Sequence, residues 1–354
     1  MSFMVSFMLL AFASVTEVYA QIQKNHSVQA IFVFGDSTVD PGNNNYITTI
    51  LKADFSPYGR DLPGQLPTGR FSNGKLTTDF IASHLGLKDF VPPYLDITLG
   101  LGDLMTGVSF ASAGSGYDPL TAQTSRTIPM EKQLEYFKEY IAKMEGVVGK
   151  DIMKMHIQKS AFVISAGTND FVFTYFTLPA RSKQYNLTEY QTFLIQNTQN
   201  FIQSLLDLGA RKIGIVGLPP IGCLPVVITT NSYSSILSSG CVNNYTEVAI
   251  EYNQKLQLEL QTMMVNNSAN KVEILYGDLY GAMHDIIQNY DTMGFDVWRR
   301  GCCGTGVLEF GILCNPRSFV CSDAAKYIFW DSIHPTKYML FLAFRKMIDN
   351  LDMS

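Results

Sequence analysis

Short apolar runs alternate with longer amphipathic stretches along most of the chain. The short runs, rich in β-branched and aromatic residues, are typical of buried strands, whereas the longer stretches repeat their apolar positions with a helical period. The predicted strands are 30–34, 108–111, 161–165, 212–216 and 272–276. The predicted helices lie near 75–86, 129–160, 187–208 and 242–266, with a last helix after Pro335.

Strand–helix–strand alternation indicates parallel pairing, because parallel strands need a crossover connection between them. The sequence therefore predicts an α/β fold: a three-layer α/β/α sandwich with a central, mainly parallel sheet of the flavodoxin-like kind. We expect one domain over residues 28–352, since no repeat, low-complexity segment or linker divides this part of the chain.

Three of the predicted strands end in loops of glycine and small polar residues, at 35–37, 112–116 and 167–170. In open parallel sheets, sites form just beyond the carboxyl ends of the strands. These loops are therefore expected at one edge of the sheet, where candidate chemistry should be sought.

The N-terminus and the charge balance narrow the class of protein. Residues 3–13 form an uncharged apolar run that precedes a small-x-small pattern ending at Ala20, which predicts a secretory signal peptide over 1–20. The alternative is a buried first helix. No later segment is apolar for long enough to span a membrane. A net charge of −5 without any Lys or Arg run excludes a nucleic-acid binder, which needs a basic face.

Cysteines and sequons agree with a secreted glycoprotein. We expect Cys223 to pair with Cys241, and Cys302 and Cys303 to pair with Cys314 and Cys321, because adjacent cysteines rarely bridge each other. The pairing among these four cysteines stays open, and we prefer the nested arrangement, in which Cys303 pairs with Cys314 and Cys302 with Cys321. The C-terminal cluster lacks paired C-x-x-C spacing and a nearby His, so we expect no metal. Four sequons predict glycosylation, at Asn25, Asn186, Asn244 and Asn266.

Candidate catalytic residues follow from what a serine hydrolase needs: a hydroxyl, a base, a group that orients the base, and oxyanion donors. Among the histidines, His334 follows an apolar run, and Asp331 lies three residues earlier, so that one turn can bring the carboxylate to Nδ1. Ser37 directly follows the first strand. Gly114 and Asn169 stand in the other two strand-end loops. Each residue alone has an ordinary alternative as a cap or turn residue, but together at one edge they favour catalysis.

The motifs that carry these residues resemble the SGNH/GDSL hydrolases, and especially the plant GDSL esterase/lipases of the extracellular-lipase type, over essentially the whole mature chain. The matching segments are FVFGDSTVDPGNNN at 32–45, PYGR at 57–60, PTGRFSNGK at 67–75, GVSFASAGSGYD at 107–118, GTND at 167–170, GLPPIGC at 217–223, GCCGTG at 301–306 and DSIHP at 331–335.

The resemblance implies that Ser37 is the nucleophile, that Asp331 and His334 complete the triad, and that Ser37, Gly114 and Asn169 supply the oxyanion hole. Two positions depart from the family pattern. The usual Leu after Gly-Asp-Ser is Thr38, and Ala113 stands where a second Gly is usual, which leaves Gly114 or Gly116 as the donor.

The sequence thus predicts a secreted, monomeric serine ester hydrolase that acts on lipid-type carboxylic esters through an acyl-enzyme, without a cofactor, and that contacts lipid surfaces. One alternative is an acyltransferase of the cutin-synthase type. Another is an inactive lipid-binding protein of the wall or pollen coat. We also expect the Asn run at 43–45 to shape the loop beside Ser37, and the aromatic cluster at 171–176 to be core rather than an acyl pocket.

Overall fold

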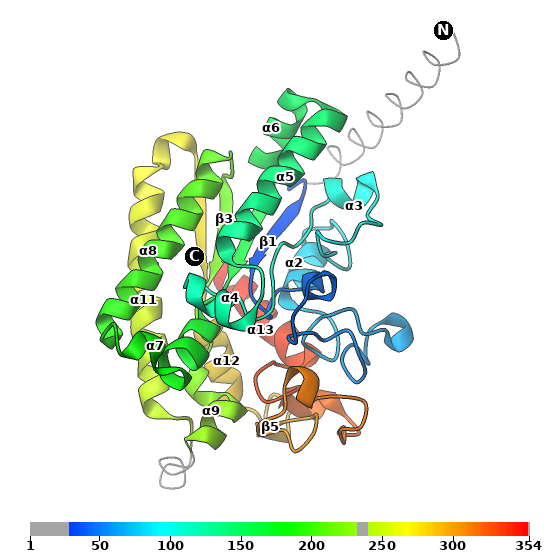
Figure 1. The fold of residues 1–354 in the computed structure, drawn as a ribbon, viewed down its shortest axis with the longest axis vertical. Helices are drawn as coiled ribbons and strands as arrows, with labels where there is room; N and C mark the ends of the chain where they lie inside the picture. The colour runs from blue at the N-terminus through cyan, green and yellow to red at the C-terminus, as the bar shows by residue number, and fades with distance from the viewer. Residues whose placement is uncertain (1–27, 232–239, 353–354) are drawn as a thin grey trace.

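A computed structural model describes residues 28–231 and 240–352 of the chain. The predicted signal peptide at 1–20 and the sequon at Asn25 lie outside the described residues. At the centre is a parallel sheet in the order β1-β2-β3-β4. Figure 1 shows this sheet among the surrounding helices. Its strands are β1 Ile31–Gly35, β2 Ala161–Ser165, β3 Lys212–Val216 and β4 Glu273–Gly277. The three pairings are in register along their whole length.

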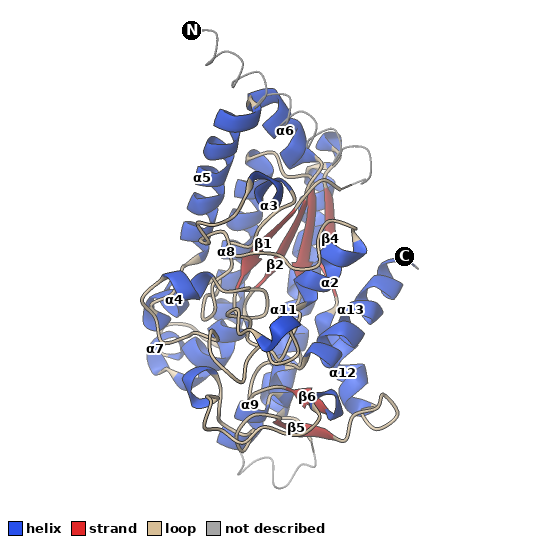
Figure 2. Cartoon of the chain, turned by 90° about the vertical axis from the view of Figure 1, so that its right-hand side faces the viewer, coloured by secondary structure: helices blue, strands red, loops and turns tan. Residues whose placement is uncertain are grey.

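Helices cover both faces of this sheet, so the predicted three-layer α/β sandwich is confirmed (Figure 2). One layer packs against β1 and β4 and consists of α5 Met130–Val148, α8 Leu187–Asp207 and α11 Asn243–Asn266. The opposite layer consists of α2 Thr77–His84, α12 Leu279–Gln288 and α13 Lys337–Asp352. The shorter helices are α3 Leu101–Met105, α4 Pro119–Ser125, α6 Lys150–Gln158, α7 Pro179–Ser182 and α9 Pro225–Thr230.

The alternation of side chains along β1 explains why this strand is apolar at every position. Phe32 and Phe34 face the α5 layer, where their rings contact Phe137 at centroid distances of 5.2 and 5.7 Å. Ile31 and Val33 face the opposite layer. A parallel strand that is covered on both sides needs hydrophobic residues throughout, as the sequence has here.

Two of the predicted elements differ from the structure. The segment at 108–111 runs beside β1 and exchanges backbone hydrogen bonds with Val33, but Ser109 forms only isolated parallel bridges, to Val33 and to Pro93, instead of a regular strand. On its other side, the Ser109 N–H donates to the Pro92 carbonyl and the Ser109 carbonyl accepts from the Tyr94 N–H, both at 2.9 Å. The long stretch at 129–160 is divided into α5 and α6 at Gly149, whose φ of 90° ends the first helix.

The C-terminal part contains a feature that the sequence pattern did not indicate. Strands β5 Val297–Gly301 and β6 Tyr327–Phe329 pair in parallel as a separate two-stranded sheet. The chain between them carries four of the six cysteines and packs against the loop at 51–71 in a small second core around Trp330. Because Asp331 and His334 follow β6 directly, this small sheet positions them.

Candidate active site

Ser37 is delivered to the carboxyl edge of the sheet by β1. The strand ends at Gly35, whose φ of 136° only glycine adopts readily, and a Cβ there would collide with the carbonyl of Ser165 on β2. The side-chain amide of Gln133 on α5 accepts from the Gly35 N–H at 2.8 Å and donates to its carbonyl at 2.9 Å. The turn that carries Ser37 is therefore fixed from both sides.

Asp331 and His334 lie opposite Ser37 and form a continuous hydrogen-bonded chain with it. His334 Nε2 is 2.9 Å from Ser37 Oγ, and His334 Nδ1 is 2.8 Å from Asp331 Oδ2. Asp331 Oδ1 also accepts from the backbone N–H groups of Ile333 and His334, at 2.9 and 2.7 Å. This tight turn is the geometric reason why a carboxylate three residues before the histidine reaches its Nδ1. All three side chains are buried.

Tyr58, in the PYGR segment, makes a contact in the site that no local sequence pattern indicates. Its hydroxyl donates to Asp331 Oδ2 at 2.7 Å and accepts from the Gly311 N–H at 2.9 Å. Burial, and then the charge of Asp331, raises the pKa of Tyr58 well above its ordinary value, so the hydroxyl keeps its proton and remains a donor. The Phe71 ring, 4.9 Å from the His334 ring, completes the packing around the imidazole.

The candidate oxyanion donors lie in the loops that meet Ser37. Gly114, with a φ of 86°, and Asn169 line the same pocket as Ser37 and His334. Asn169 donates one amide hydrogen to the Ser115 carbonyl at 2.9 Å, which fixes the amide and leaves its second hydrogen available. Gly116 does not line this pocket, and a Cβ there would meet the Asp170 carboxylate. The structure therefore brings Gly114, rather than Gly116, to the site.

Two buried carboxylates hold the loops together around Ser37. Asp40 accepts from the backbone N–H groups of Gly42, Asn43 and Ala113 at 2.7–2.9 Å, so it links the first loop to the second. Asp170 accepts from the N–H groups of Tyr117 and Asp118. Burial raises the pKa of Asp40 to about 6 and that of Asp170 to about 7, and the hydrogen bonds that both accept oppose this.

The expectation for the Asn run is confirmed, because all three side chains bond to backbone carbonyls. Asn43 Nδ2 donates to the Ser109 and Ala111 carbonyls, both at 2.8 Å, and Asn45 Nδ2 donates to Thr68. Asn44 Nδ2 donates to the Leu51 and Ala113 carbonyls. The run thus fastens the β1 loop to the segment at 109–113.

The aromatic cluster after Asn169 is mostly core, as expected. It forms a π-helical segment, Asp170–Thr177, in which Phe171 is fully buried against Tyr190 and Tyr252. Phe173 is the exception, since it lines the pocket beside Ser37 and packs on Phe310 at 5.8 Å.

The six cysteines lie in three disulfide bonds, Cys223–Cys241, Cys302–Cys321 and Cys303–Cys314, the last two in the nested arrangement. Within the described ranges, no group of three or more His, Cys, Asp or Glu side chains is arranged to hold a metal ion. No helix between residues 28 and 352 that the structure describes is both long and apolar enough to cross a bilayer.

Comparison with known proteins shows the family to which the chain belongs. The sequence model of the GDSL-like Lipase/Acylhydrolase family matches residues 31–344, and the chain belongs to this family. It is 51% identical over 325 residues to GDSL esterase/lipase At5g45960 of Arabidopsis thaliana, over 92% of this chain and 87% of that protein. It is 44% identical to At1g06990, over 87% and 85%, and 45% identical to At2g04570, over 88% and 87%, both also GDSL esterase/lipases of Arabidopsis thaliana. The predicted resemblance to plant GDSL esterase/lipases is confirmed.

Proposed function

We propose that this chain hydrolyses carboxylic esters with Ser37 as the nucleophile. The observation that carries the proposal is the hydrogen-bonded chain from Ser37 Oγ through His334 to Asp331, at 2.9 and 2.8 Å. A serine hydroxyl bonded to an imidazole whose other nitrogen faces a buried carboxylate is the arrangement that activates serine for acyl transfer. Membership of a family whose members are named esterase/lipases agrees with this chemistry.

The geometry supports an acyl-enzyme mechanism in two steps. His334 Nε2 takes the proton of Ser37 Oγ as the oxygen attacks the ester carbonyl, and Asp331 stabilises the imidazolium that forms. His334 then returns the proton to the departing alcohol, which leaves an acyl group on Ser37. In the second step His334 activates a water molecule that attacks the acyl carbon, releasing the acid and restoring the serine.

The oxyanion of each step is expected to bind three donors, the N–H groups of Ser37 and Gly114 and the free amide hydrogen of Asn169. Within the described residues, neither backbone N–H has an acceptor among the hydrogen bonds of the protein. Donors that are fixed in advance but unpaired in the resting enzyme are what stabilises a developing negative charge.

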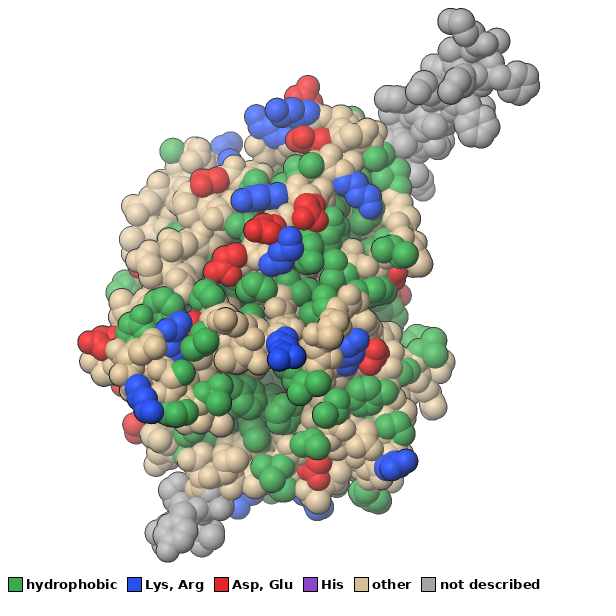
Figure 3. Space-filling view, viewed as in Figure 1, with side chains coloured by type: hydrophobic (Ala, Val, Ile, Leu, Met, Phe, Trp, Pro, Cys, Tyr) green, Lys and Arg blue, Asp and Glu red, His purple; other side chains and the backbone are tan. Residues whose placement is uncertain are grey.

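We further propose that the chain is secreted as a monomeric glycoprotein that acts on lipid-type esters at lipid surfaces. Three disulfide bonds support an oxidising compartment, and the side chains of Asn186, Asn244 and Asn266 are exposed. Figure 3 shows hydrophobic side chains gathered around a hollow on the lower half of one face, which suits an apolar substrate.

Replacement of the nucleophile tests the function. Ser37→Ala should reduce turnover of a nitrophenyl acetate by more than ~10³-fold with an unchanged melting temperature, because the side chain lies at the site and outside the core. The matched control is Ser182→Ala, an exposed serine on α7, which should keep full activity. If Ser37→Ala retains a tenth of the activity, the assignment is wrong. Product analysis with added alcohol tests the acyltransferase alternative, and absence of turnover in the parent would favour the binding-only alternative.

A further inference from the structure

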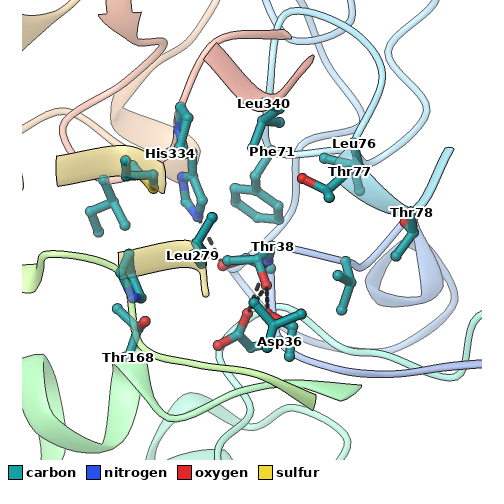
Figure 4. Close-up of a pocket in the computed structure, with 18 of the residues that line it drawn as sticks. Asp36, Thr38, Phe71, Leu76, Thr77, Thr78, Thr168, Leu279, His334 and Leu340 are labelled. Atoms are coloured by element: carbon teal, nitrogen blue, oxygen red, sulfur yellow. Dashed lines mark hydrogen bonds between the residues drawn. The ribbon is translucent and has the colours of Figure 1, made fainter. Parts of the chain in front are cut away.

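A second cavity also reaches Ser37 and is distinct from the pocket that contains Gly114. It enters the molecule between the sheet and the α2–α12–α13 layer, as Figure 4 shows. Its deeper walls are hydrophobic and come from both layers. They are formed by Ile81, Val163, Val216, Leu279, Met283 and Met347. Ser37, Asn169 and His334 stand at its mouth, and its other polar lining residues include Thr77 and Thr78 at the start of α2.

This cavity separates two apolar clusters that cover the same face of the sheet. Val163 belongs to the cluster of β1 and α2 that includes Val33 and Ala82, whereas Met283 and Met347 belong to the main core. Protein interiors are normally filled to the density of organic crystals, so space left between two apolar clusters beside a reactive serine needs an explanation.

The chemistry of the walls indicates hydrocarbon as the occupant. Thr38, at the mouth, has its hydroxyl bonded to Asp36 at 2.7 Å and to Ser165 at 2.8 Å, so it offers no free group to a polar ligand. None of the buried polar side-chain atoms that lack a partner in the described part of the chain lies in this cavity. A polar substrate group placed against the six hydrophobic side chains, away from the hydroxyls of Thr77 and Thr78, would lose its hydration without finding a partner.

The pocket that contains Gly114 has a more polar lining. It is lined by the hydroxyls of Thr121, Thr124 and Ser125 together with Leu51 and Phe310, and Thr124 is exposed. Ser37, Phe71, Asn169, Ile333 and His334 line both spaces. When the carbonyl of an ester lies at Ser37, its acyl chain and its alcohol group therefore extend into different pockets, one into each.

The two-step reaction indicates which pocket holds the acyl chain and which holds the alcohol. The acyl group stays on the enzyme while the alcohol leaves and water enters, so the alcohol needs the accessible pocket and the acyl chain needs the enclosed one. On the basis of the proposed function, we propose that the cavity under α2, α12 and α13 is the acyl-binding site and takes an unbranched fatty acyl chain.

The depth of the cavity sets the length of that chain. Val163 lies two residues before the end of β2 at Ser165, a distance of roughly 7 Å along a strand, which matches about six extended carbons. Met283 and Met347, which line the helical side of the cavity, are unbranched side chains that adapt to ligands of slightly different shape. We therefore expect medium-chain esters to be preferred over acetates and over long chains.

A pair of substitutions at Met283 tests the assignment with nitrophenyl esters of two, six, eight and twelve carbons. Met283→Phe fills the cavity and should lower kcat/KM for the eight-carbon ester by at least about tenfold more than it lowers kcat/KM for the acetate. Met283→Ala lengthens the cavity and should shift the preferred acyl length upward. The matched control is Met263→Phe, a buried methionine on α11 in the opposite layer, which should leave the chain-length profile unchanged.

The outcomes separate this proposal from the proposed function. If the parent turns over acetate in a Ser37-dependent way but neither Met283 variant changes the chain-length profile, the acyl assignment is wrong and the function stands. A loss that is uniform across all chain lengths in both variants also overturns it. If the parent hydrolyses no ester at all, it is the proposed function that fails. Melting temperatures of the variants confirm that each is folded.

Discussion

Asp331 accepts hydrogen bonds from several other groups of the candidate site. It is fully buried and accepts hydrogen bonds from the imidazole of His334, from two backbone N–H groups and from the hydroxyl of Tyr58. A buried carboxylate needs such partners, because burial without them disfavours its charge. The contact from Tyr58 differs from the others in that it comes from a segment far away in the sequence.

Tyr58→Phe should lower kcat by about tenfold and leave KM almost unchanged, since the lost bond is to a charged group that acts on the base and not on the substrate. The matched control is Tyr140→Phe, which removes the hydroxyl of another fully buried tyrosine that donates to the Leu104 carbonyl at 2.9 Å. Both variants should lose stability, but only Tyr58→Phe should lose turnover. Equal kcat values for the two variants, measured at saturating ester, would mean that Tyr58 has only a structural role.

At the scale of elements, the strands and the residues at their ends could be predicted because local sequence determines them. Four of the five predicted strands coincide with β1 to β4 to within a residue. The clearest case is β1, which is apolar and buried at every position because helices cover both of its sides. The loops that follow β1 and β2 carry Ser37 and Asn169 to one edge, as the alternation of strands and helices required.

What could not be predicted depends on contacts between distant segments. Tyr58 and Asp331 are separated by 273 residues, and no local pattern indicates that they meet. The same holds for β5 and β6, whose pairing brings together segments on either side of the cysteine cluster. The acyl cavity is also a property of packing, because its walls come from two strands and three helices.

The cysteine-rich segment connects to the site through backbone hydrogen bonds. The N–H groups of Cys302 and Cys303 donate to the carbonyls of Phe329 and Trp330, the residues just before Asp331, at 3.0 and 2.8 Å. Gly311, which donates to Tyr58, lies inside the loop closed by Cys303 and Cys314. The segment therefore supports Asp331 both directly and through Tyr58.

Replacing Cys303 and Cys314 together by alanine should lower the free energy of unfolding by about 3 kcal/mol, the loop-entropy value for a closed loop of this size. The comparison is the double alanine variant of Cys223 and Cys241, whose similar sequence separation predicts a similar loss. Urea unfolding measures both. Turnover per folded molecule should fall more in the first variant, because only that loop contains Gly311. An equal effect on turnover would contradict the coupling between this segment and Asp331.

For the whole molecule, buried ionisable groups make stability depend on pH in two opposing ways. Burial raises the pKa of Asp36 and Asp40 to about 6 and that of Asp170 to about 7, so the folded state holds protons that the unfolded state has released. These groups reduce stability as the pH rises from about 4 to 7. Burial lowers the pKa of His156 to about 4, so this group acts in the opposite direction over much of the same range. The two contributions therefore partly cancel in the dependence of the overall stability on pH.

A variant of His156 separates the contribution of this histidine from that of the buried carboxylates. The imidazole is fully buried at the end of α6, its Nδ1 lies 3.3 Å from Gln29 Oε1, and its ring meets the edge of Phe32. Because the unfolded histidine takes up a proton near pH 6.5 and the folded one only near 4, its contribution is complete above 6.5 and is lost as the pH falls.

His156→Leu removes this titration and leaves that of the carboxylates. The stability of the parent relative to this variant should therefore be about 2 kcal/mol lower at pH 5 than at pH 7.5, when both are measured by urea unfolding. The packing change costs the same at both pH values, so it cancels in the comparison. An NMR titration of the parent should show the His156 ring neutral at pH 5. A stability difference that does not vary with pH would mean that the folded protein accommodates the His156 charge.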